Sequence, residues 1–235
     1  MIRAIYFFIY FWWYLLLTFP SLIMVVIFAR KNNIIEKDKI INRVTKHWAK
    51  SMIGVTGSTV RVTGEENVPL EGAVLFVSNH QGNFDIPIMV GFIDKPKAFI
   101  SKLELKKIPI FSIWMKHLGC IFLDRKNARQ SLGAIDQGAE LLKKGYSYVV
   151  FPEGTRSKDG TLGMFKPGSF KLAIKSGVPI VPVTIKGSRN MMKKNSFIIR
   201  PAFVDVIISP PIHVQGVEPN ELTQKVRAVI ENNLR

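Results

Sequence analysis

The chain has 235 residues, enough for one α/β domain with a full core and a short additional segment. It carries 33 lysines and arginines against 17 acidic residues, a formal net charge of +16. Its expected partners are therefore anionic: phosphate headgroups, an anionic bilayer, an acidic carrier protein or nucleic acid. The single cysteine, Cys120, excludes an intrachain disulfide framework.

The first segment, residues 4–29, is almost wholly apolar and carries no charge. As one helix it would be roughly 39 Å long, which exceeds the roughly 30 Å hydrocarbon core of a bilayer. Pro20 removes a backbone hydrogen bond and predicts a kink. The run is longer than is typical of a cleavable signal peptide. We therefore expect a membrane segment, which either spans the bilayer or lies in one leaflet.

Basic residues follow this segment at once: Arg30, Lys31, Lys37, Lys39, Arg43, Lys46 and Lys50. The positive-inside rule predicts that everything after residue 29 lies on the cytoplasmic side of the cytoplasmic membrane. Residues 36–54 predict an amphipathic helix, because apolar residues recur at three- and four-residue spacing. Its apolar face lies either at the membrane interface or on the protein's own core. We expect a two-helix membrane-anchoring segment in residues 1–57 and a catalytic domain in residues 58–235.

The rest of the chain alternates short β-branched runs with helical stretches. The expected strands are 59–63, 73–77, 98–100, 121–123, 148–151, 180–185 and 202–208. The expected helices are 85–93, 103–117, 128–144, 168–176 and 219–233. This alternation predicts an α/β fold with a mostly parallel or mixed sheet flanked by helices. Ligands of such sheets bind beyond the carboxyl ends of the strands, where three unusual motifs of this chain are expected.

The first motif is Asn-His-Gln-Gly-Asn-Phe-Asp at residues 79–85. A histidine accepts a proton near neutral pH, and a carboxylate holds the imidazole in the required tautomer. On a regular helix, side chains five residues apart point about 140° away from each other. The turn chemistry of Gly82 and Asn83 is therefore needed to bring His80 and Asp85 together. A histidine with a structural hydrogen bond is the alternative interpretation.

The chain lacks the motifs of several other mechanisms. It contains no Gly-x-Ser-x-Gly elbow, and Cys120 lies in an apolar strand, where an inert thiol is expected. His80 and Asp85 are too few ligands for a metal site, and no cofactor is expected. We therefore expect a substrate hydroxyl to attack directly, with His80 as general base and Asp85 as its orienting partner. Backbone N–H groups near Gly82 to Phe84, or in residues 153–156, are the candidates for stabilising the oxyanion.

The other two motifs carry cations at strand ends. Arg125 follows an apolar strand, and Arg156 follows a glycine loop; a pair of guanidinium groups suits a phosphate. Lys102 adds a point charge after another strand. Glu153 either orients Arg156, contacts glycerol hydroxyls, or is a capping or salt-bridged carboxylate. Solvated surface charge is the alternative for the cations.

Two prolines, Pro179 and Pro182, interrupt the apolar strand near residue 180 and predict an edge or bulged strand. A purely structural role explains Pro179 as well as a role at the substrate site does. The lysine-rich surface, including Lys193 and Lys194, is a candidate docking face for an acidic carrier, although solvated charge is the favoured interpretation for most of these lysines.

Taken together and in this order, residues 79–85, 119–125 and 151–156 resemble the motifs of the glycerophospholipid acyltransferase family. The resemblance implies transfer of a fatty acyl group from a thioester of coenzyme A or acyl carrier protein. The acceptor would be the 2-hydroxyl of lysophosphatidic acid, taken from the membrane, and the product phosphatidic acid. The resemblance also implies His80 as base and Asp85 as its partner. It places the following residues in acceptor binding: Arg125, Glu153, Gly154, Thr155 and Arg156. It puts the segment around Pro179 near the acyl site.

Other functions remain open at this point. The chain is alternatively an acyltransferase for another lysophospholipid or for glycerol 3-phosphate, or a membrane-bound lipid ester hydrolase. A non-enzymatic basic tether is a third interpretation. Because the basic charge is spread through the chain, a nucleic-acid partner is not expected. Acyl-chain length, the choice of donor and the oligomeric state are not encoded in a readable pattern.

Overall fold

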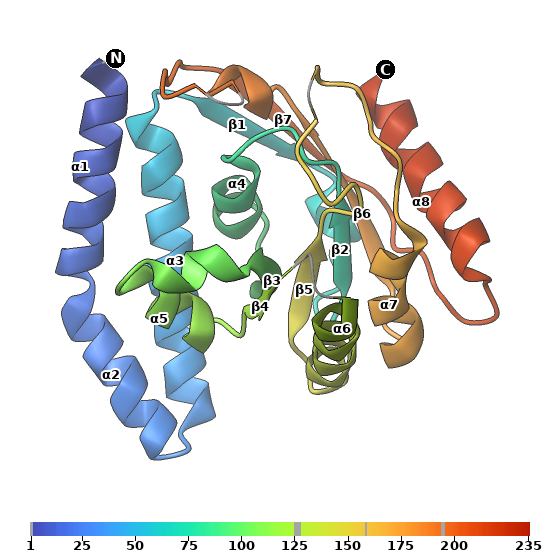
Figure 1. Ribbon diagram of the computed structural model, residues 1–235, viewed down its shortest axis with the longest axis horizontal. Coiled ribbons are helices and arrows are strands. Elements are labelled where there is room, and N and C mark those ends of the chain that lie inside the picture. Colours follow the sequence, from blue (N-terminus) through green and yellow to red (C-terminus); the bar gives the residue numbers. More distant parts are fainter. Residues whose placement is uncertain (1, 125–127, 158, 194–195) are drawn as a thin grey trace.

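A seven-stranded mixed sheet forms the centre of the protein, and helices cover both of its faces (Figure 1). The computed structural model describes residues 2–124, 128–157, 159–193 and 196–235. The strand order is β1-β7-β6-β2-β5-β3-β4. The strands are β1 (Thr59–Thr63), β2 (Leu75–Ser78), β3 (Lys97–Lys102), β4 (Ile121–Leu123), β5 (Ser147–Val150), β6 (Ile180–Lys186) and β7 (Phe203–Ile208). The expected α/β class is confirmed.

The five strands from β6 to β4 run parallel, whereas β7 is antiparallel to β6 and β1 is parallel to β7. In β2 the side chains alternate between two cores. Leu75 and Val77 face the cluster that α6, α7 and α8 cover, and Phe76 faces the cluster beneath α4. Because both faces are buried, this strand is a continuous apolar run in the sequence.

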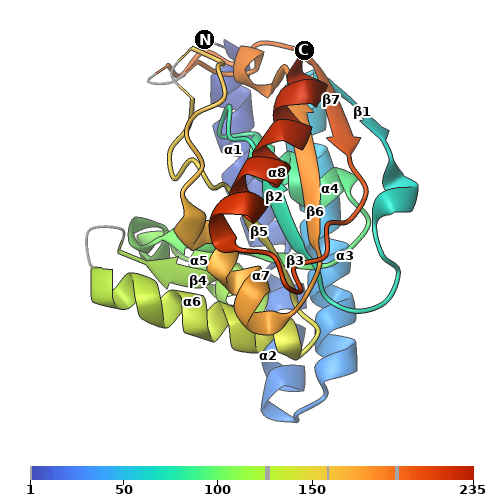
Figure 2. The same ribbon diagram turned by 90° about the vertical axis from the view of Figure 1, so that its right-hand side faces the viewer.

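Eight α-helices are described. They are α1 (Ile2–Leu17), α2 (Phe19–Arg30), α3 (Ile34–Val55), α4 (Asp85–Phe92), α5 (Phe111–His117), α6 (Ala128–Lys143), α7 (Lys171–Ser176) and α8 (Pro219–Leu234). Figure 2 looks onto the face covered by α6, α7 and α8, and α1 to α4 lie behind the sheet. Both termini lie at the same end of the molecule in both views. The loops that follow β2 and β5 reach this end as well (Figure 1).

The expected helix over residues 103–117 is divided in two. A short 3-10 helix, Leu103–Lys107, is followed by α5, which begins at Phe111. Pro109 explains the break, because its ring disfavours the helical conformation of Ile108, which is extended. Ile110 then adopts a positive φ of 61° before α5 begins.

The proline-containing strand was expected to be an edge or a bulged strand, and the edge position is wrong. β6 lies inside the sheet, between β7 and β2. Its ladder with β7 begins at the pair Val183 and Ile208, so Pro182 lies just beyond it. The Pro182 carbonyl accepts a hydrogen bond from Ser209 N at 2.9 Å. The missing N–H of the proline therefore interrupts no bond of the ladder.

The N-terminal segment forms two helices that pack on the domain. Among the described residues no single helix is long and apolar enough to cross a bilayer; α1 and α2 together meet that criterion by length and composition, with a bend of 45° between them. The break at Thr18 lies two residues before Pro20, which occupies the first turn of α2. One face of α1 is buried, and its Phe7 ring meets the Phe84 ring edge-on at 5.3 Å.

The apolar face of α3 packs on the protein's own core, as one of the two interpretations proposed. Its buried residues are Ile40, Ile41, Ala49, Met52 and Ile53. Gly91 lets α4 approach α3 closely, because a Cβ at this position would lie 3.0 Å from the Lys50 backbone nitrogen and 3.1 Å from the Ala49 Cβ. α4 is therefore held between α3 and the sheet.

A buried lysine, Lys97, binds the carbonyl groups at the C-terminal end of α4. Lys97 Nζ donates to the carbonyls of Met89 and Ile93 at 2.9 and 2.8 Å, and it lies 5.5 Å from the centre of the Phe76 ring. Cations are favourable at helix C-termini. Burial nevertheless lowers the pKa of Lys97 to about 7, with Asp94 opposing the shift.

This lysine should make stability depend on pH. Because the folded-state pKa lies below the unfolded value, the unfolded chain binds more protons between about pH 7 and pH 10. The free energy of unfolding should therefore rise over that window by about a few kcal/mol and level off below it. Urea titrations from pH 6 to pH 10 measure it. In Lys97→Met the rise should be much smaller, and equal slopes in the two proteins would refute the assignment.

Candidate active site

His80 and Asp85 come together where β2 gives way to α4. His80 lies two residues beyond the end of β2, and Asp85 is the first residue of α4. His80 Nδ1 lies 2.7 Å from Asp85 Oδ2, so the expected contact across the turn is present. A carboxylate at this place also benefits from the positive end of the helix dipole.

Asp85 is completely buried and accepts from four groups. Its Oδ2 receives the backbone N–H of Gln81 at 2.7 Å and of Gly82 at 2.8 Å besides the imidazole N–H. Its Oδ1 receives the hydroxyl of Ser188 at 2.5 Å. This set of donors suits an ionised carboxylate, and it fixes His80 with its proton on Nδ1. The Nε2 lone pair is then the proton acceptor of the ring.

The Gly82 N–H is excluded as an oxyanion donor by this arrangement, because it already donates to Asp85. The Gly154 N–H is excluded in the same way, because it donates to the Phe151 carbonyl. Asn83, Phe84 and the other residues of the loop 153–156 remain candidates for that role. Asn79, the residue before His80, is buried and bonds both backbone groups of Ile185 on β6, with distances of 2.8 and 2.9 Å. Its side chain thereby ties the loop to the sheet.

Two backbone hydrogen bonds and one ring contact also hold His80 in place. Its backbone N–H donates to Glu153 Oε1 and its carbonyl accepts from Ser157 N, each at 2.8 Å. Its ring stacks on Phe151, with ring centres 4.1 Å apart and planes 19° apart. The side chain keeps 16% of its surface exposed, so a substrate can reach the ring. An imidazole with fixed orientation and one open edge is what general-base chemistry requires.

Glu153 contacts backbone rather than Arg156. Its Oε2 accepts from Gly163 N at 3.0 Å, while Oε1 accepts from His80 N. Burial raises the pKa of Glu153, and these two N–H groups counteract the rise. The expected orientation of Arg156 by this carboxylate is replaced by a contact to Asn83, whose Oδ1 accepts from Arg156 Nη1 at 2.5 Å. Glu153 therefore joins the His80 loop to the loop around Gly163.

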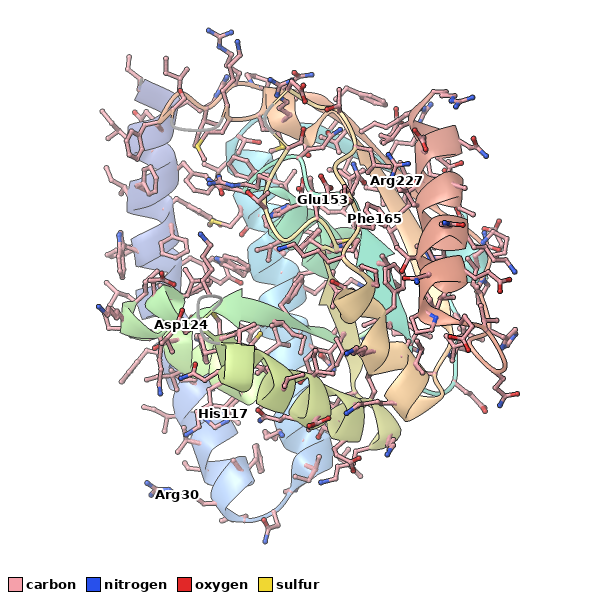
Figure 3. All side chains as sticks on the ribbon, turned by 45° about the vertical axis from the view of Figure 1, so that its right-hand side comes forward. Arg30, His117, Asp124, Glu153, Phe165 and Arg227 are labelled. Atoms are coloured by element: carbon pink, nitrogen blue, oxygen red, sulfur yellow. The ribbon has the colours of Figure 1, made fainter. Side chains whose placement is uncertain are left out.

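Residues of the 153–156 segment line an open groove together with Ser157, Asp159, Thr161 and residues 163–167. Its lining includes Glu153, Thr155, Arg156 and Lys166. Thr155 is exposed, and Gly154 has a φ of +70°. A Cβ on Gly154 would lie 3.1 Å from Lys166 Nζ, so a second cation lies over this glycine. Figure 3 shows Glu153 and Phe165 close together in this region, while His117 and Arg30 lie well below them.

Of the other expected cations, the structure describes Lys102 but not Arg125. Lys102 is exposed at the end of β3 and is not among the residues that line this groove. Arg125 lies outside the described residues, as does Lys194. The described residues include no group of three or more His, Cys, Asp or Glu side chains placed to hold a metal ion. Burial raises the pKa of the Cys120 thiol to about 12, so it is not a thiolate at neutral pH.

Three residues of the site have no counterpart among the expected ones. Ser188 contacts Asp85, Phe151 stacks on His80, and Lys166 covers Gly154. Phe151 is the first residue of the Phe-Pro-Glu-Gly-Thr-Arg segment, so the sequence offered a signal for its place in the site. Lys166 follows the end of that segment by ten residues. Ser188 is 103 residues away from Asp85 along the chain, and no local pattern marks it.

The comparisons with known proteins identify the family of this chain. The Acyltransferase family model matches residues 59–186, which include His80, Asp85 and the 153–156 loop. The chain belongs to the acyltransferase family. In overall fold it is similar to the crystal structure of the 1-acyl-sn-glycerophosphate (LPA) acyltransferase PlsC from Thermotoga maritima. That match has a TM-score of 0.89 and 31% identity, and it covers 99% of this chain and 93% of the other.

Curated acyltransferases are also similar in sequence. The chloroplastic 1-acyl-sn-glycerol-3-phosphate acyltransferase LPAT1 of Arabidopsis thaliana is 38% identical over 81% of this chain and 53% of its own length. A probable 1-acyl-sn-glycerol-3-phosphate acyltransferase of Mycoplasma genitalium is 31% identical over 83% of this chain and 76% of its own. The chain thus spans about half the length of the plant relative and three quarters of the bacterial one.

Proposed function

We propose that this acyltransferase moves a fatty acyl group from a thioester of coenzyme A or acyl carrier protein to the 2-hydroxyl of lysophosphatidic acid, giving phosphatidic acid. The observation that carries the proposal is the His80 imidazole, bound through Nδ1 to buried Asp85 and open at its other edge. The names of the similar acyltransferases indicate the same acceptor.

In this mechanism the acceptor hydroxyl gives its proton to His80 Nε2 while its oxygen attacks the thioester carbonyl. The tetrahedral intermediate collapses, the carbon–sulfur bond breaks, and the leaving thiolate takes the proton from the imidazolium. Asp85 stabilises that imidazolium and keeps the ring oriented. No acyl-enzyme forms, and positioning and oxyanion stabilisation supply the rest of the acceleration.

The acceptor phosphate is proposed to bind in the groove beside the 153–156 loop. Arg156 and Lys166 bring positive charge there from two segments. Guanidinium groups bind phosphate bidentately, and the adjacent Asn83 holds Arg156 toward the His80 loop. Roles for Lys102, Arg125, Gly154 and Thr155 in acceptor binding remain predictions.

Arg156→Ala should raise the Michaelis constant for lysophosphatidic acid by about tenfold or more and change turnover less. It removes a contact that exists before the chemical step, so binding is the property affected. Steady-state kinetics with a saturating donor measure the two constants. Arg227→Ala on α8, whose guanidinium pairs with Glu231, is the matched control. A normal Michaelis constant in Arg156→Ala would remove this residue from the acceptor site.

An apolar pocket is proposed to take the acyl chain. Residues of α1, α3, α4, α5 and β3 line it, among them Ile86, Phe99 and Trp114. Ile86 directly follows Asp85, so the pocket adjoins the catalytic turn. Cys120 also lines it as a protonated thiol, which leaves the surface apolar.

Membrane association of the N-terminal helices is part of the proposal. The exposed face of α1 and α2 is apolar and aromatic: Ile2, Ile5, Tyr6, Phe8, Ile9, Trp12, Trp13, Leu16, Leu17, Phe19, Ile23, Met24 and Ile27. An exposed apolar patch of this extent indicates contact with a membrane or a protein. Residues 1–57 would hold the catalytic residues 58–235 at the cytoplasmic face of the cytoplasmic membrane, where the acceptor is taken from the lipid.

The reaction products test the function directly. Purified protein is incubated with lysophosphatidic acid and an acyl donor labelled in its acyl group, using coenzyme A and carrier-protein thioesters in parallel. Label should appear in phosphatidic acid, with little in free fatty acid. Label mainly in free fatty acid would instead identify a hydrolase. Transfer only to glycerol 3-phosphate or to another lysophospholipid would correct the acceptor.

A further inference from the structure

The connection between β6 and β7, which follows Lys186 and ends before Phe203, exposes large apolar side chains. Phe197 is 78% exposed and Ile198 is 43% exposed. The neighbouring Ile199 is buried, in the same core cluster as Ala4 of α1. An exposed aromatic and aliphatic pair beside a buried anchor residue indicates a surface with a partner.

The described part of this connection is held in place by its own hydrogen bonds. Arg200 N donates to the Met191 carbonyl at 2.9 Å, and Ile198 N donates to Ser196 Oγ at 3.1 Å. The backbone bond closes the connection at its base. Phe197 and Ile198 are therefore presented at a fixed place on the surface.

This place adjoins the exposed face of α1. An open groove there is lined by Ile2, Arg3, Tyr6, Tyr10, Val55 and Ile199, so α1, α3 and the connection share it. A Cβ on Gly57 would lie 3.6 Å from Pro201 and 3.8 Å from the Arg3 guanidinium, which shows that the first turn of α1 and residue 201 meet. In Figures 1 and 2 the connection runs along the same end of the molecule as the start of α1.

The charges around Phe197 suit an anionic lipid surface. Lys193 and Arg200 are exposed on the connection, and Arg3 lines the adjoining groove. Cations flanking an aromatic residue are typical of segments that lie at the headgroup level, where the ring enters the lipid and the charges stay with the phosphates.

The same connection begins at the active site. Ser188, which donates to Asp85, lies in the 3-10 turn Ser188–Asn190 immediately after β6. Met191 follows and is buried in the core cluster that contains Phe84. A contact between Phe197 and the bilayer would therefore fix the side of the molecule on which the His80 loop meets the lipid.

We propose that residues 196–200 form a second membrane contact, separate in sequence from residues 4–29, in which Phe197 and Ile198 enter the headgroup region of an anionic bilayer. This inference rests on the proposed membrane association of α1 and α2. Two contacts, one along α1 and one on the connection, set the tilt of the enzyme on the membrane and direct the site toward acceptor in the same leaflet.

Site-directed fluorescence tests this contact. The one native cysteine, Cys120, is only partly buried and lines the apolar pocket, so it is first replaced by alanine. A cysteine introduced at Phe197 is then labelled with an environment-sensitive nitrobenzoxadiazole probe. On phosphatidylglycerol–phosphatidylcholine vesicles its emission should shift to the blue and be quenched by nitroxide-labelled lipid. Leu70→Cys, at a residue that is 97% exposed in the loop before β2, is the matched control and should report water.

The label at Ile9, an exposed residue of α1, separates the two proposals. If Ile9→Cys reports lipid while Phe197→Cys behaves like Leu70→Cys, the second contact is refuted and the anchoring helices stand. If neither label reports lipid, membrane association itself fails, and this inference fails with it. Lipid signals at both positions support both.

Kinetics give a second readout. Phe197→Ser should lower the rate on long-chain acceptor embedded in vesicles by about three- to tenfold, because it removes apolar area from the lipid contact. It should leave the rate on a water-soluble short-chain acceptor unchanged, whereas Leu70→Ser should change neither. An equal loss on both acceptors would point to damage at the catalytic turn and would contradict the proposal.

Discussion

His80→Ala is expected to lower turnover by about two orders of magnitude or more while the protein remains folded. The imidazole is the group placed to accept the proton of the acceptor hydroxyl, and general-base assistance is worth about 10²–10⁴ in rate. The substitution removes one ring and leaves the backbone bonds of residue 80 to Glu153 and Ser157 available. Acyl transfer at saturating substrates gives the turnover, and thermal unfolding reports the fold.

His213→Ala is the matched control, because that histidine is exposed beyond the end of β7. Its turnover should equal that of the unaltered protein. A His80→Ala protein that is folded and retains more than about a tenth of the activity would show that another group takes the proton.

Asp85→Asn is expected to reduce turnover by about 10²–10⁴-fold with a smaller loss of stability. The amide has the shape of the carboxylate, and its oxygen can still accept from Gln81 and Gly82. Ser188 can rotate its hydroxyl to accept from the new NH₂ group. The negative charge is lost, however, so the protonated His80 is no longer stabilised.

Asp85→Ala should behave differently from Asp85→Asn. It would leave buried N–H groups of Gln81 and Gly82 without an acceptor, at about 1–3 kcal/mol each. The alanine variant should therefore show a clear drop in the midpoint of urea unfolding, which the asparagine variant largely avoids. Asp136→Asn, at an exposed carboxylate on α6, controls for the change of net charge. Full activity in folded Asp85→Asn would exclude a role for this charge in the reaction.

Much of the fold follows from local patterns in the sequence. The β-branched runs predicted all seven strands within a few residues. The central strands β2, β5 and β6 are buried on both faces and therefore mostly apolar, whereas β1 and β7 at the other side of the sheet alternate in burial. The position of the candidate site followed from the same argument, since the residues after β2 and β5 meet at one edge of a parallel sheet. The contact between His80 and Asp85 could be expected from the turn residues Gly82 and Asn83.

Prolines were harder to interpret, because their effect depends on neighbours far along the chain. Pro109 broke a predicted helix, which its own chemistry explains. Pro182 suggested an edge strand, yet it lies in an interior one. Its missing N–H is tolerated only because the ladder between β6 and β7 starts one residue later, and that register has no local signal.

The supporting contacts of the site could not be predicted. Ser188 reaches Asp85 because β6 lies beside β2, so the pair depends on the order of strands in the sheet. Glu153 was expected to bind a guanidinium or substrate, and its actual partners are two backbone N–H groups. Every residue type except proline presents a backbone N–H, so the sequence carries no mark of these partners.

The ring contact between Phe7 and Phe84 has a practical consequence for attempts to obtain a water-soluble enzyme by shortening the chain. Phe84 immediately precedes Asp85, and it is shielded in part by the N-terminal helix. A protein that starts at residue 58 would bare this aromatic ring and the flank of α4 together. We expect such a fragment to aggregate or to lose the contact between His80 and Asp85. A soluble enzyme is better sought by exchanging the outward-facing side chains of α1 for polar ones.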